Sequence, residues 1–237
     1  MFRLSTKLVP VAVAGTLMIA GPAGAQDAPA AMTRSDIEQI VREYLLENPE
    51  ILVEVSRALT EKQQAEAQKD LFGSAEDAVL GNPDGSKTVV EFFDYNCGYC
   101  RQAYGEAQKA IAANPDLKIV LKEYPILGPD SEDAHIVAVA LRRIAPGKYA
   151  EFHNNMYTTD GRATEEKAVE IATDLGVDED ELRAAMSEEE TVQQLEKTQK
   201  LGRALQVNGT PTYFDENGPF GFDSLVSRTA PQEAQDG

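Results

Sequence analysis

The chain has 237 residues, with 40 acidic and 22 basic side chains, and its formal net charge is −18. A field of this sign repels nucleic acid phosphates and anionic lipid surfaces, so we expect neither as a partner. The chain contains two cysteines, too few for the disulfide framework that holds small secreted domains together.

Residues 1–25 have the pattern of a secretory signal peptide. Arg3 and Lys7 precede an apolar run at 8–20, and Ala23-Gly24-Ala25 supplies small residues for cleavage. The apolar run is shorter than the roughly 20 residues that a membrane-spanning helix needs. This length favours a cleaved peptide over a retained membrane anchor, and the sequence therefore predicts export.

Residues 26–72 form a predicted helical arm. Apolar side chains recur at helical spacing between residues 33 and 71, and Ser35 is the expected N-cap of the first helix. Asn48-Pro49 divides the pattern into two helices, because the residue before a proline avoids the α region and proline suits the first helical turn. The apolar stripe predicts either self-association through residues 33–71 or packing of the arm on its own domain.

A strand, a helix and a second strand follow the arm. The β-branched and aromatic run at 88–94 predicts a buried strand. A helix is expected to continue to Ala113, where Asn114-Pro115 ends it, and 117–127 reads as the second strand. This order, with a helix as the crossover, predicts a βαβ unit.

The remainder of the chain is predicted to be mostly helical before it returns to strand. Helical patterns occupy 131–145, 148–157, 164–176, 178–186 and 189–205, strand character returns at 207–218, and a short last helix is expected at 222–228. Residues 230–237 have the composition of a disordered tail. We therefore expect one domain at 73–229 with a helical insertion at about 130–200.

Cys97 and Cys100 lie in a Cys-Gly-Tyr-Cys motif between the first predicted strand and the helix that follows it. A disulfide across two residues closes a very short loop, which gives little stabilisation in the chain-entropy model. Backbone N–H groups and the helix dipole favour a thiolate at Cys97. We therefore assign Cys97 as the nucleophile and Cys100 as the resolving thiol, with Gly98 and Tyr99 tuning the redox potential.

A metal site is the alternative use of the cysteines. His135 and His153 are the two histidines of the chain, and their spacing from Cys100 matches no common zinc pattern. Both lie on predicted helices, where an ordinary core or surface histidine is the simpler interpretation. The dithiol of Cys97 and Cys100 alone suits a soft ion such as Cu(I), so copper binding stays open, and no cofactor is expected.

Three segments, EFFDYNCGYC, LKEYPILGPDS and VNGTPTYF, resemble the DsbA-like family of periplasmic thiol-disulfide oxidoreductases. The resemblance covers about residues 80–215, and the downstream Gly-Thr-Pro makes it far more specific than the cysteine pair alone. It implies an α/β, thioredoxin-like fold with an inserted helical domain and an N-terminal helical arm. Implied partners are unfolded or misoxidised exported proteins and a membrane redox partner.

The resemblance also implies roles for further residues. Thr210-Pro211 matches the cis-proline loop that faces the cysteines, where the Thr210 backbone would pair with a bound peptide as a strand does. Glu91 and Lys122 match a buried charged pair beneath the active site, which would assist proton movement to and from Cys100. Ordinary strand charges are the alternative interpretation of Glu91 and Lys122.

The direction of exchange is suggested by the residues around the cysteines. Gly98-Tyr99 and Thr210 resemble the isomerase and reductase members of the superfamily rather than the strong oxidants with Pro-His between the cysteines. The arm resembles that of the oligomeric ScsC-type, copper-tolerance-associated proteins. We therefore expect an isomerase or reductase, with net oxidation as the alternative within the class.

Two further features complete the comparison with the family. Tyr95, Tyr99 and Tyr104 would offer apolar surface to an unfolded substrate, although ordinary packing is the simpler interpretation. The segment after Pro211 is shorter than the β-hairpin and terminal helix that are usual in this family. How this shorter segment completes the sheet is not predicted by the sequence.

Overall fold

The computed structural model describes residues 32–73 and 76–231. The predicted signal peptide and the predicted tail beyond residue 231 lie outside these ranges. The chain divides into two units between Leu52 and Val53. Within the described ranges, the helices include none that is both long and apolar enough to cross a bilayer.

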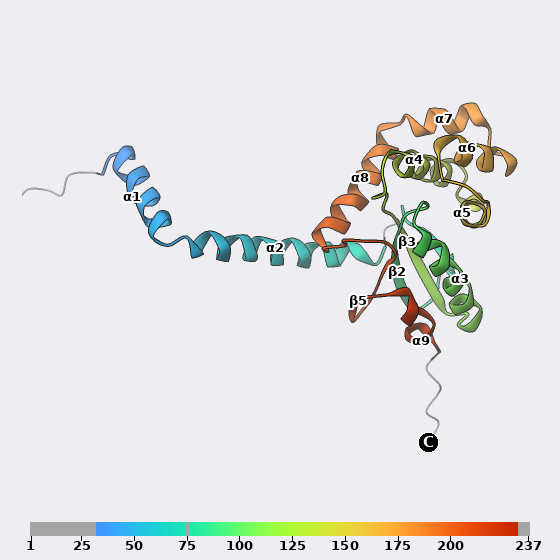
Figure 1. The fold of residues 1–237 in the computed structure, drawn as a ribbon, viewed down its shortest axis with the longest axis horizontal. Coiled ribbons are helices and arrows are strands. Elements are labelled where there is room, and N and C mark those ends of the chain that lie inside the picture. Colours follow the sequence, from blue (N-terminus) through green and yellow to red (C-terminus); the bar gives the residue numbers. More distant parts are fainter. Residues whose placement is uncertain (1–31, 74–75, 232–237) are drawn as a thin grey trace, which may run out of the picture. The chain divides into compact units, whose positions relative to one another are not determined.

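Figure 1 shows the helices and strands of the described chain, with α4 to α8 following one another without an intervening strand. The strands are β1 (Ala78–Gly81), β2 (Lys87–Phe93), β3 (Leu117–Glu123), β4 (Thr212–Asp215) and β5 (Gly218–Phe220). The helices are α1 (Arg34–Glu47), α2 (Glu50–Leu71), α3 (Gly98–Ala113), α4 (Pro129–Ile144), α5 (Tyr149–Thr158), α6 (Glu165–Asp174), α7 (Glu179–Met186), α8 (Glu189–Ala204) and α9 (Leu225–Thr229). The order of elements agrees with the predicted order, except that β1 and β5 were not predicted.

Helix α1 begins at a capping box. The Asp36 backbone N–H donates to the Thr33 hydroxyl at 3.3 Å, and the Thr33 backbone N–H donates to the Asp36 carboxylate at 2.9 Å. The prediction of Ser35 as the N-cap was wrong, because this reciprocal pair satisfies two N–H groups that a cap at Ser35 would leave open. The predicted interruption at Asn48-Pro49 is present, since α1 ends at Glu47 and α2 begins at Glu50.

Within the described residues, the strands form one five-stranded sheet in the order β1-β3-β2-β4-β5. β2 and β3 are parallel, as a βαβ unit requires, and the other neighbouring strands are antiparallel. The short segment after Pro211 still supplies the β4-β5 hairpin and helix α9. The short β4-β5 hairpin therefore forms one edge of the sheet.

Strand β3 ends at Glu123, four residues before the predicted end. Tyr124 donates one further N–H to the Phe93 carbonyl at 2.9 Å, and Pro125 has no N–H to continue the ladder. The next N–H groups, of Ile126 and Leu127, bond to the Asp94 side chain instead. The chain thus leaves the sheet just beside the cysteine motif.

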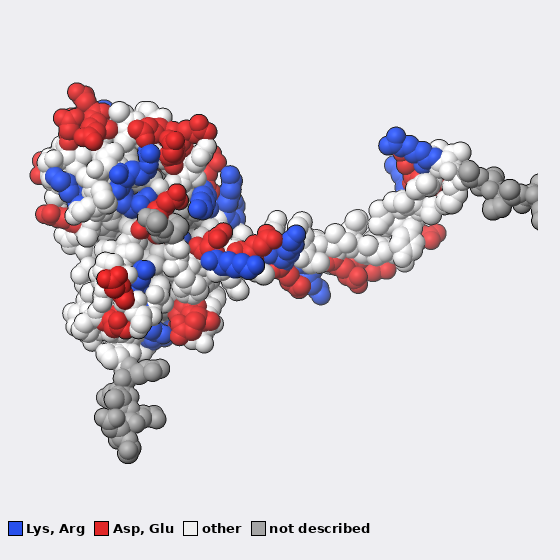
Figure 2. All heavy atoms as spheres, turned by 180° about the vertical axis from the view of Figure 1, so that it is seen from behind, with Lys and Arg blue, Asp and Glu red and all other residues white. Residues whose placement is uncertain are grey.

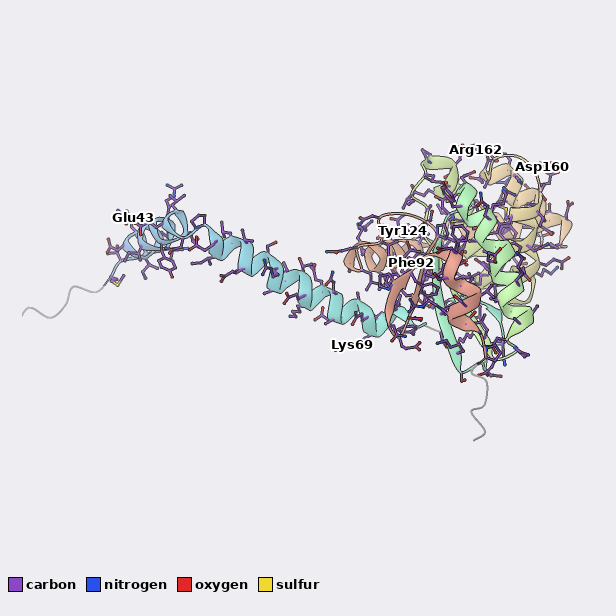
Figure 3. All side chains as sticks on the ribbon, turned by 60° about the horizontal axis from the view of Figure 1, so that its bottom comes forward. Glu43, Lys69, Phe92, Tyr124, Asp160 and Arg162 are labelled. Carbon is purple, nitrogen blue, oxygen red and sulfur yellow. The ribbon has the colours of Figure 1, made fainter. Side chains whose placement is uncertain are left out.

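The two faces of the sheet are covered by different helices. On one face, Val89, Phe93 and Leu121 pack with α3 and with the helices of the insertion in a large apolar core. On the other face, Phe92 contacts Tyr124 with ring centroids 5.5 Å apart (Figure 3), together with the ends of α2 and α8. On the side that Figure 2 shows, acidic and basic side chains are interspersed over the unit that contains the sheet. The cysteine motif belongs to the first of these faces.

Candidate redox site

Cys97 and Cys100 lie where β2 leads into α3. Cys97 is the N-cap of α3, with φ −81° and ψ 118°, and Cys100 lies in the first turn of the helix. Both are free thiols in this structure. Cys97 is 8% exposed, whereas Cys100 is fully buried, so Cys97 is the thiol that an external disulfide can reach.

The two thiols have opposite protonation tendencies. Hydrogen bonding from the Cys100 thiol is the largest of the effects that lower the pKa of Cys97 to about 5; the Thr210 side chain and backbone N–H groups of α3 add to it, against the effect of burial. Burial raises the pKa of Cys100, as do the neighbouring Cys97 and Glu91. A thiolate nucleophile beside a protonated, protected thiol is the arrangement that disulfide exchange requires.

The loop before β4 completes the surroundings of Cys97. The peptide bond between Thr210 and Pro211 is cis, and the Cys97 thiol donates to the Thr210 carbonyl, with 3.1 Å between Sγ and O. The fold therefore brings Thr210-Pro211 against the nucleophile, in the position that the family resemblance implies.

Glu91 and Lys122 do not form the charged pair that the resemblance implies. In the β2-β3 register, Glu91 lies opposite Leu121, and Lys122 lies opposite Phe92. Because side chains alternate along a strand, Glu91 and Lys122 point to opposite faces of the sheet. Lys122 pairs instead with Asp77, with 2.6 Å between Nζ and Oδ2. The implied Glu91–Lys122 pair is thus wrong for this chain.

Glu91 does lie beneath the cysteines, as the resemblance implies. Its side chain is buried at 3% exposure on the same face as Cys97 and Cys100. Burial raises the pKa of Glu91 to about 8, with Tyr213 acting to lower it and Cys97 acting to raise it further. A carboxyl group with a pKa in this range exchanges protons near neutral pH, which suits an acid or base that serves a thiol.

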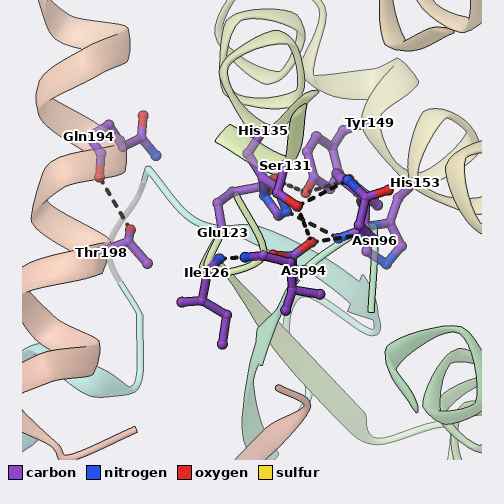
Figure 4. Close-up of polar contacts among 12 residues, drawn as sticks. Asp94, Asn96, Glu123, Ile126, Ser131, His135, Tyr149, His153, Gln194 and Thr198 are labelled. Atoms are coloured by element: carbon purple, nitrogen blue, oxygen red, sulfur yellow. Dashed lines mark hydrogen bonds and ion pairs between the residues drawn. The ribbon is translucent and has the colours of Figure 1, made fainter. Parts of the chain in front are cut away.

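Asp94 is fully buried just after β2, and its side chain accepts hydrogen bonds from the loop that follows β3. Its Oδ2 accepts the backbone N–H groups of Ile126 and Leu127 at 2.8 and 3.0 Å. Its Oδ1 accepts the Ser131 hydroxyl and the Asn96 backbone N–H, both at 2.8 Å, as Figure 4 shows in part. Asp94 was not predicted as a site residue; the available signal was an acidic residue at the end of an apolar strand, three residues before the nucleophile.

Asn96, next to the nucleophile, binds the inserted helices. Its side-chain amide donates to the Ala163 carbonyl at 2.9 Å and to the Ser131 hydroxyl at 3.0 Å. Its side-chain oxygen accepts the Ala163 backbone N–H at 2.8 Å. The turn that carries Cys97 is therefore hydrogen-bonded both to α4 and to the segment between α5 and α6.

The two histidines belong to a buried hydrogen-bond network (Figure 4). The Tyr95 backbone N–H donates to His135 Nε2 at 3.2 Å, which assigns the ring proton to Nδ1, the atom that contacts Glu123. The Tyr149 hydroxyl donates to the same carboxylate, and the Tyr95 hydroxyl bonds His153 Nδ1 at 3.0 Å. In the described part of the chain, no cluster of three or more His, Cys, Asp or Glu side chains is arranged for a metal ion.

The three tyrosines near the motif differ in exposure. Tyr95 is buried, and Tyr104 is partly buried and stacks on Tyr157 with ring centroids 5.3 Å apart. Tyr99 is 64% exposed, and its ring centroid lies 6.5 Å from that of Phe222. Of the three, Tyr99 presents an open ring beside the cysteines.

Known proteins share both parts of this architecture. The family model of the DSBA-like thioredoxin domain matches residues 88–227, and that of the copper resistance protein ScsC N-terminal domain matches residues 34–66. A thioredoxin-like oxidoreductase from Silicibacter pomeroyi DSS-3 is 38% identical, with a TM-score of 0.61, over 67% of this chain and 94% of that chain. ScsC of Proteus mirabilis in a transitional conformation is 22% identical, with a TM-score of 0.61, over 85% of this chain and 98% of that chain.

Among curated relatives, disulfide bond formation protein D of Bacillus subtilis is 24% identical over 57% of this chain. The match spans 66% of that protein, and only 24% and 22% of two Na(+)/H(+) antiporters, so the chain covers less than two thirds of each of them. The predicted thioredoxin-like fold and the resemblance are confirmed, because the DSBA-like match covers more than half of the chain and includes both cysteines. This chain therefore belongs to the DSBA-like thioredoxin family of thiol-disulfide oxidoreductases.

Proposed function

We propose that this protein catalyses dithiol-disulfide exchange with protein substrates, as a disulfide isomerase or reductase. The observation that carries the proposal is the asymmetry of the two thiols. Cys97 is reachable and has a lowered pKa, whereas Cys100 is buried and has a raised one. The two cysteines divide the reaction between an attacking thiolate and a resolving thiol.

The exchange begins when the Cys97 thiolate attacks a disulfide of the substrate. A mixed disulfide forms, and one substrate sulfur leaves as a thiolate. Reduction is completed when Cys100 loses its proton and attacks Cys97 Sγ, so that the Cys97–Cys100 disulfide forms and the second substrate sulfur leaves. In isomerisation, another thiolate of the substrate attacks the mixed disulfide and releases Cys97, with no net transfer of electrons.

The direction of exchange is inferred from the residues that frame the thiols. Gly98 and Tyr99 separate the cysteines, and Thr210 precedes the cis-proline, as in the isomerase and reductase members that the sequence resembles. In isomerase or reductase operation, a membrane redox partner would keep Cys97 reduced. Net oxidation of substrates is the alternative, and a reduction potential of the Cys97–Cys100 pair close to that of strong oxidants would support it.

The proposed location is the periplasm, and the proposed substrates are unfolded or misoxidised exported proteins. The predicted signal peptide at 1–25 supports export. A solved relative from Salmonella enterica serovar Typhimurium is described as a periplasmic thioredoxin-like protein, although at 21% identity it shares the fold alone. The exposed Tyr99 ring beside Cys97 offers such substrates an apolar contact.

We also propose that the protein forms a homo-oligomer through residues 33–71. The match to the ScsC N-terminal domain covers most of this segment, and α1 has no buried residue of its own. An oligomer would present several Cys97 thiolates to one misfolded substrate, which favours repeated attack and hence isomerisation.

Two activity assays test the proposal. The mature protein is expected to accelerate reduction of insulin by dithiothreitol and to restore activity to scrambled ribonuclease. Cys97→Ser should abolish both activities, whereas Cys100→Ser should still form mixed disulfides that are not resolved and accumulate as covalent complexes. Wild-type protein that behaves as Cys97→Ser in both assays would contradict the proposed function.

Copper binding by the dithiol remains the second candidate. The matched N-terminal domain takes its name from a copper resistance protein, and two thiols suit Cu(I). Titration of the reduced protein with Cu(I) against a competing chelator separates the two candidates. Tight, stoichiometric binding without any exchange activity would replace the enzymatic proposal.

A further inference from the structure

Among the described residues, no lysine pairs with Glu91, the buried acid beneath the cysteines. Lys122 points to the other face of the sheet and pairs with Asp77. On the Glu91 side, β3 contributes the apolar Leu121 opposite Glu91. An isolated buried carboxylate is strongly disfavoured, so some other donor has to support Glu91 whenever it carries charge.

Tyr213 is placed to be that donor. In the β2-β4 register, Tyr213 lies directly opposite Glu91, and directly opposed residues of an antiparallel pair point to the same face. The Tyr213 side chain is fully buried, and its ring stacks on Phe220 with centroids 5.6 Å apart. Its hydroxyl acts on the Glu91 carboxyl to lower the pKa of that group.

The Tyr213 hydroxyl is nevertheless one of two buried hydroxyls that make no direct hydrogen bond within the described residues. The other belongs to Tyr157, on the inserted helix α5. Tyr157 is 3% exposed, and its ring centroid lies 6.4 Å from that of Phe93, which is on the same face of β2 as Glu91. Burial raises the pKa of Tyr157, as do Cys100 and Glu91. An unpaired buried hydroxyl costs folding free energy. The unpaired hydroxyls of Tyr213 and Tyr157 are therefore candidate hydrogen-bond donors to Glu91.

We propose that Tyr213 is a positioning residue, assisted by Tyr157, whose hydroxyl donates a hydrogen bond to the Glu91 carboxylate and thereby prepares Glu91 to take the proton of Cys100. This inference rests on the proposed exchange reaction and adds a specific donor to it. The neutral acid is a weaker acceptor than the carboxylate, so a hydrogen bond from Tyr213 favours the charged form of Glu91.

In the resolving step, the proton of the Cys100 thiol passes to the Glu91 carboxylate. The Cys100 thiolate then attacks Cys97 Sγ in the mixed disulfide, the bond between Cys97 and the substrate breaks, and the substrate sulfur leaves as a thiolate. Among the described residues, Cys97, Cys100, Tyr157, Tyr213 and Tyr95, just after β2, interact electrostatically with Glu91. None of these groups carries a positive charge during the exchange reaction. The Glu91 carboxylate is therefore stabilised by hydrogen bonds from tyrosine hydroxyls rather than by an ion pair.

The test uses Tyr213→Phe, Tyr157→Phe and the double variant, because phenylalanine keeps the buried ring and removes the hydroxyl alone. The Glu91 pKa is measured in the reduced protein by NMR of the labelled carboxyl carbon, and resolution is timed from a preformed mixed disulfide on Cys97. Loss of one hydrogen bond to a carboxylate is expected to raise the Glu91 pKa by about one unit in Tyr213→Phe. The resolving rate at neutral pH should then fall about tenfold, and its pH profile should move upward by the same amount.

Tyr124→Phe is the matched control, because this buried tyrosine lies on the other face of the sheet and donates to the Val207 carbonyl at 3.1 Å. It should leave both the Glu91 pKa and the resolving rate unchanged. An unchanged Glu91 pKa in Tyr213→Phe and in the double variant would overturn the inference, as would a shifted pKa with an unaltered resolving rate. Failure of the proposed function is distinguishable, since wild-type protein would then resolve no mixed disulfide at any pH.

Discussion

Cys97 and Glu91 lie in one buried site and couple folding to pH in opposite directions. The pKa of Cys97 falls from 9.0 to about 5 on folding, so its contribution to stability is full above pH 9 and is lost as the pH falls through 5. The pKa of Glu91 rises from 4.5 to about 8, so its contribution is full below pH 4.5 and is lost as the pH rises through 8. Between pH 5 and pH 8 the two effects oppose each other.

Glu91→Gln is expected to remove the destabilising effect of Glu91 at higher pH, so that the pH dependence of stability due to Cys97 becomes measurable. In the reduced protein, the variant should gain stability relative to wild type as the pH rises from 4.5 to 8, because wild type must then ionise a buried acid or keep it protonated at a cost. The gain should exceed about 1 kcal/mol, since each unit of pKa shift corresponds to about 1.4 kcal/mol. Urea denaturation at several pH values measures this difference.

The control for this prediction is Glu170→Gln, which removes an exposed carboxylate on α6. Its stability difference from wild type should stay constant across the same pH range. A difference between Glu91→Gln and wild type that does not change with pH would contradict the assignment of a raised pKa to Glu91.

The reactive residues of the site could be predicted from sequence because their signals are local or belong to a short motif. Cys97 and Cys100 are two residues apart after a strand pattern, and Gly-Thr-Pro marks the loop that holds Pro211. The position of Lys122 could not be predicted in the same way, since the pairing register of β2 and β3 decides which face each side chain occupies. Tyr213 was missed for the same reason, because its place opposite Glu91 exists only in the paired sheet.

The elements show the same division between local and distant signals. The break at Asn48-Pro49 and the end of α3 before Pro115 were predictable, because proline restricts its own backbone and the residue before it. Strand β1 has four residues and pairs with β3. A strand of this length is too short to show a periodic pattern in the sequence. The two hydrogen bonds between Asn96 and Ala163 join residues 67 positions apart, beyond the reach of any local pattern.

Asn96→Ala is predicted to loosen the connection between the cysteine turn and the inserted helices. The change removes the Asn96 hydrogen bonds to both backbone groups of Ala163 and to the Ser131 hydroxyl. Unpaired buried polar groups cost about 1–3 kcal/mol each, so thermal unfolding should shift down by several degrees. Hydrogen exchange should speed up most at 159–164, the segment between α5 and α6.

Asn217→Ala provides the comparison, because Asn217 is an exposed residue between β4 and β5. It should leave exchange at 159–164 unaltered. If Asn96→Ala melts at the wild-type temperature and exchanges at the wild-type rate there, the hydrogen bonds of Asn96 do not hold the insertion in place.

At the scale of the whole molecule, helix α1 lacks packing contacts within its own described unit that would stabilise it. It has 14 residues and none of them is buried, and a helix of this length is marginal in water when nothing packs against it. Apolar side chains that should be covered are exposed, among them Ile37, Val41 and Tyr44 at 50, 51 and 57%. A second copy of the chain is the partner that the proposed oligomer supplies.

Val41→Lys is therefore expected to dissociate the oligomer, because it places a charge within the apolar face of α1. Light scattering of the mature protein should give a multiple of the chain mass for wild type and a single chain mass for Val41→Lys. Gln39→Lys adds the same charge to the same helix at a polar position, where Gln39 donates to Glu43, and should remain oligomeric.

In activity assays, Val41→Lys should keep its insulin reduction per chain, since each cysteine pair is intact, and should lose most of its refolding of scrambled ribonuclease. A wild-type protein that scatters as a monomer would contradict self-association, and equal refolding by Val41→Lys monomers and wild-type oligomers would show that isomerisation does not depend on assembly.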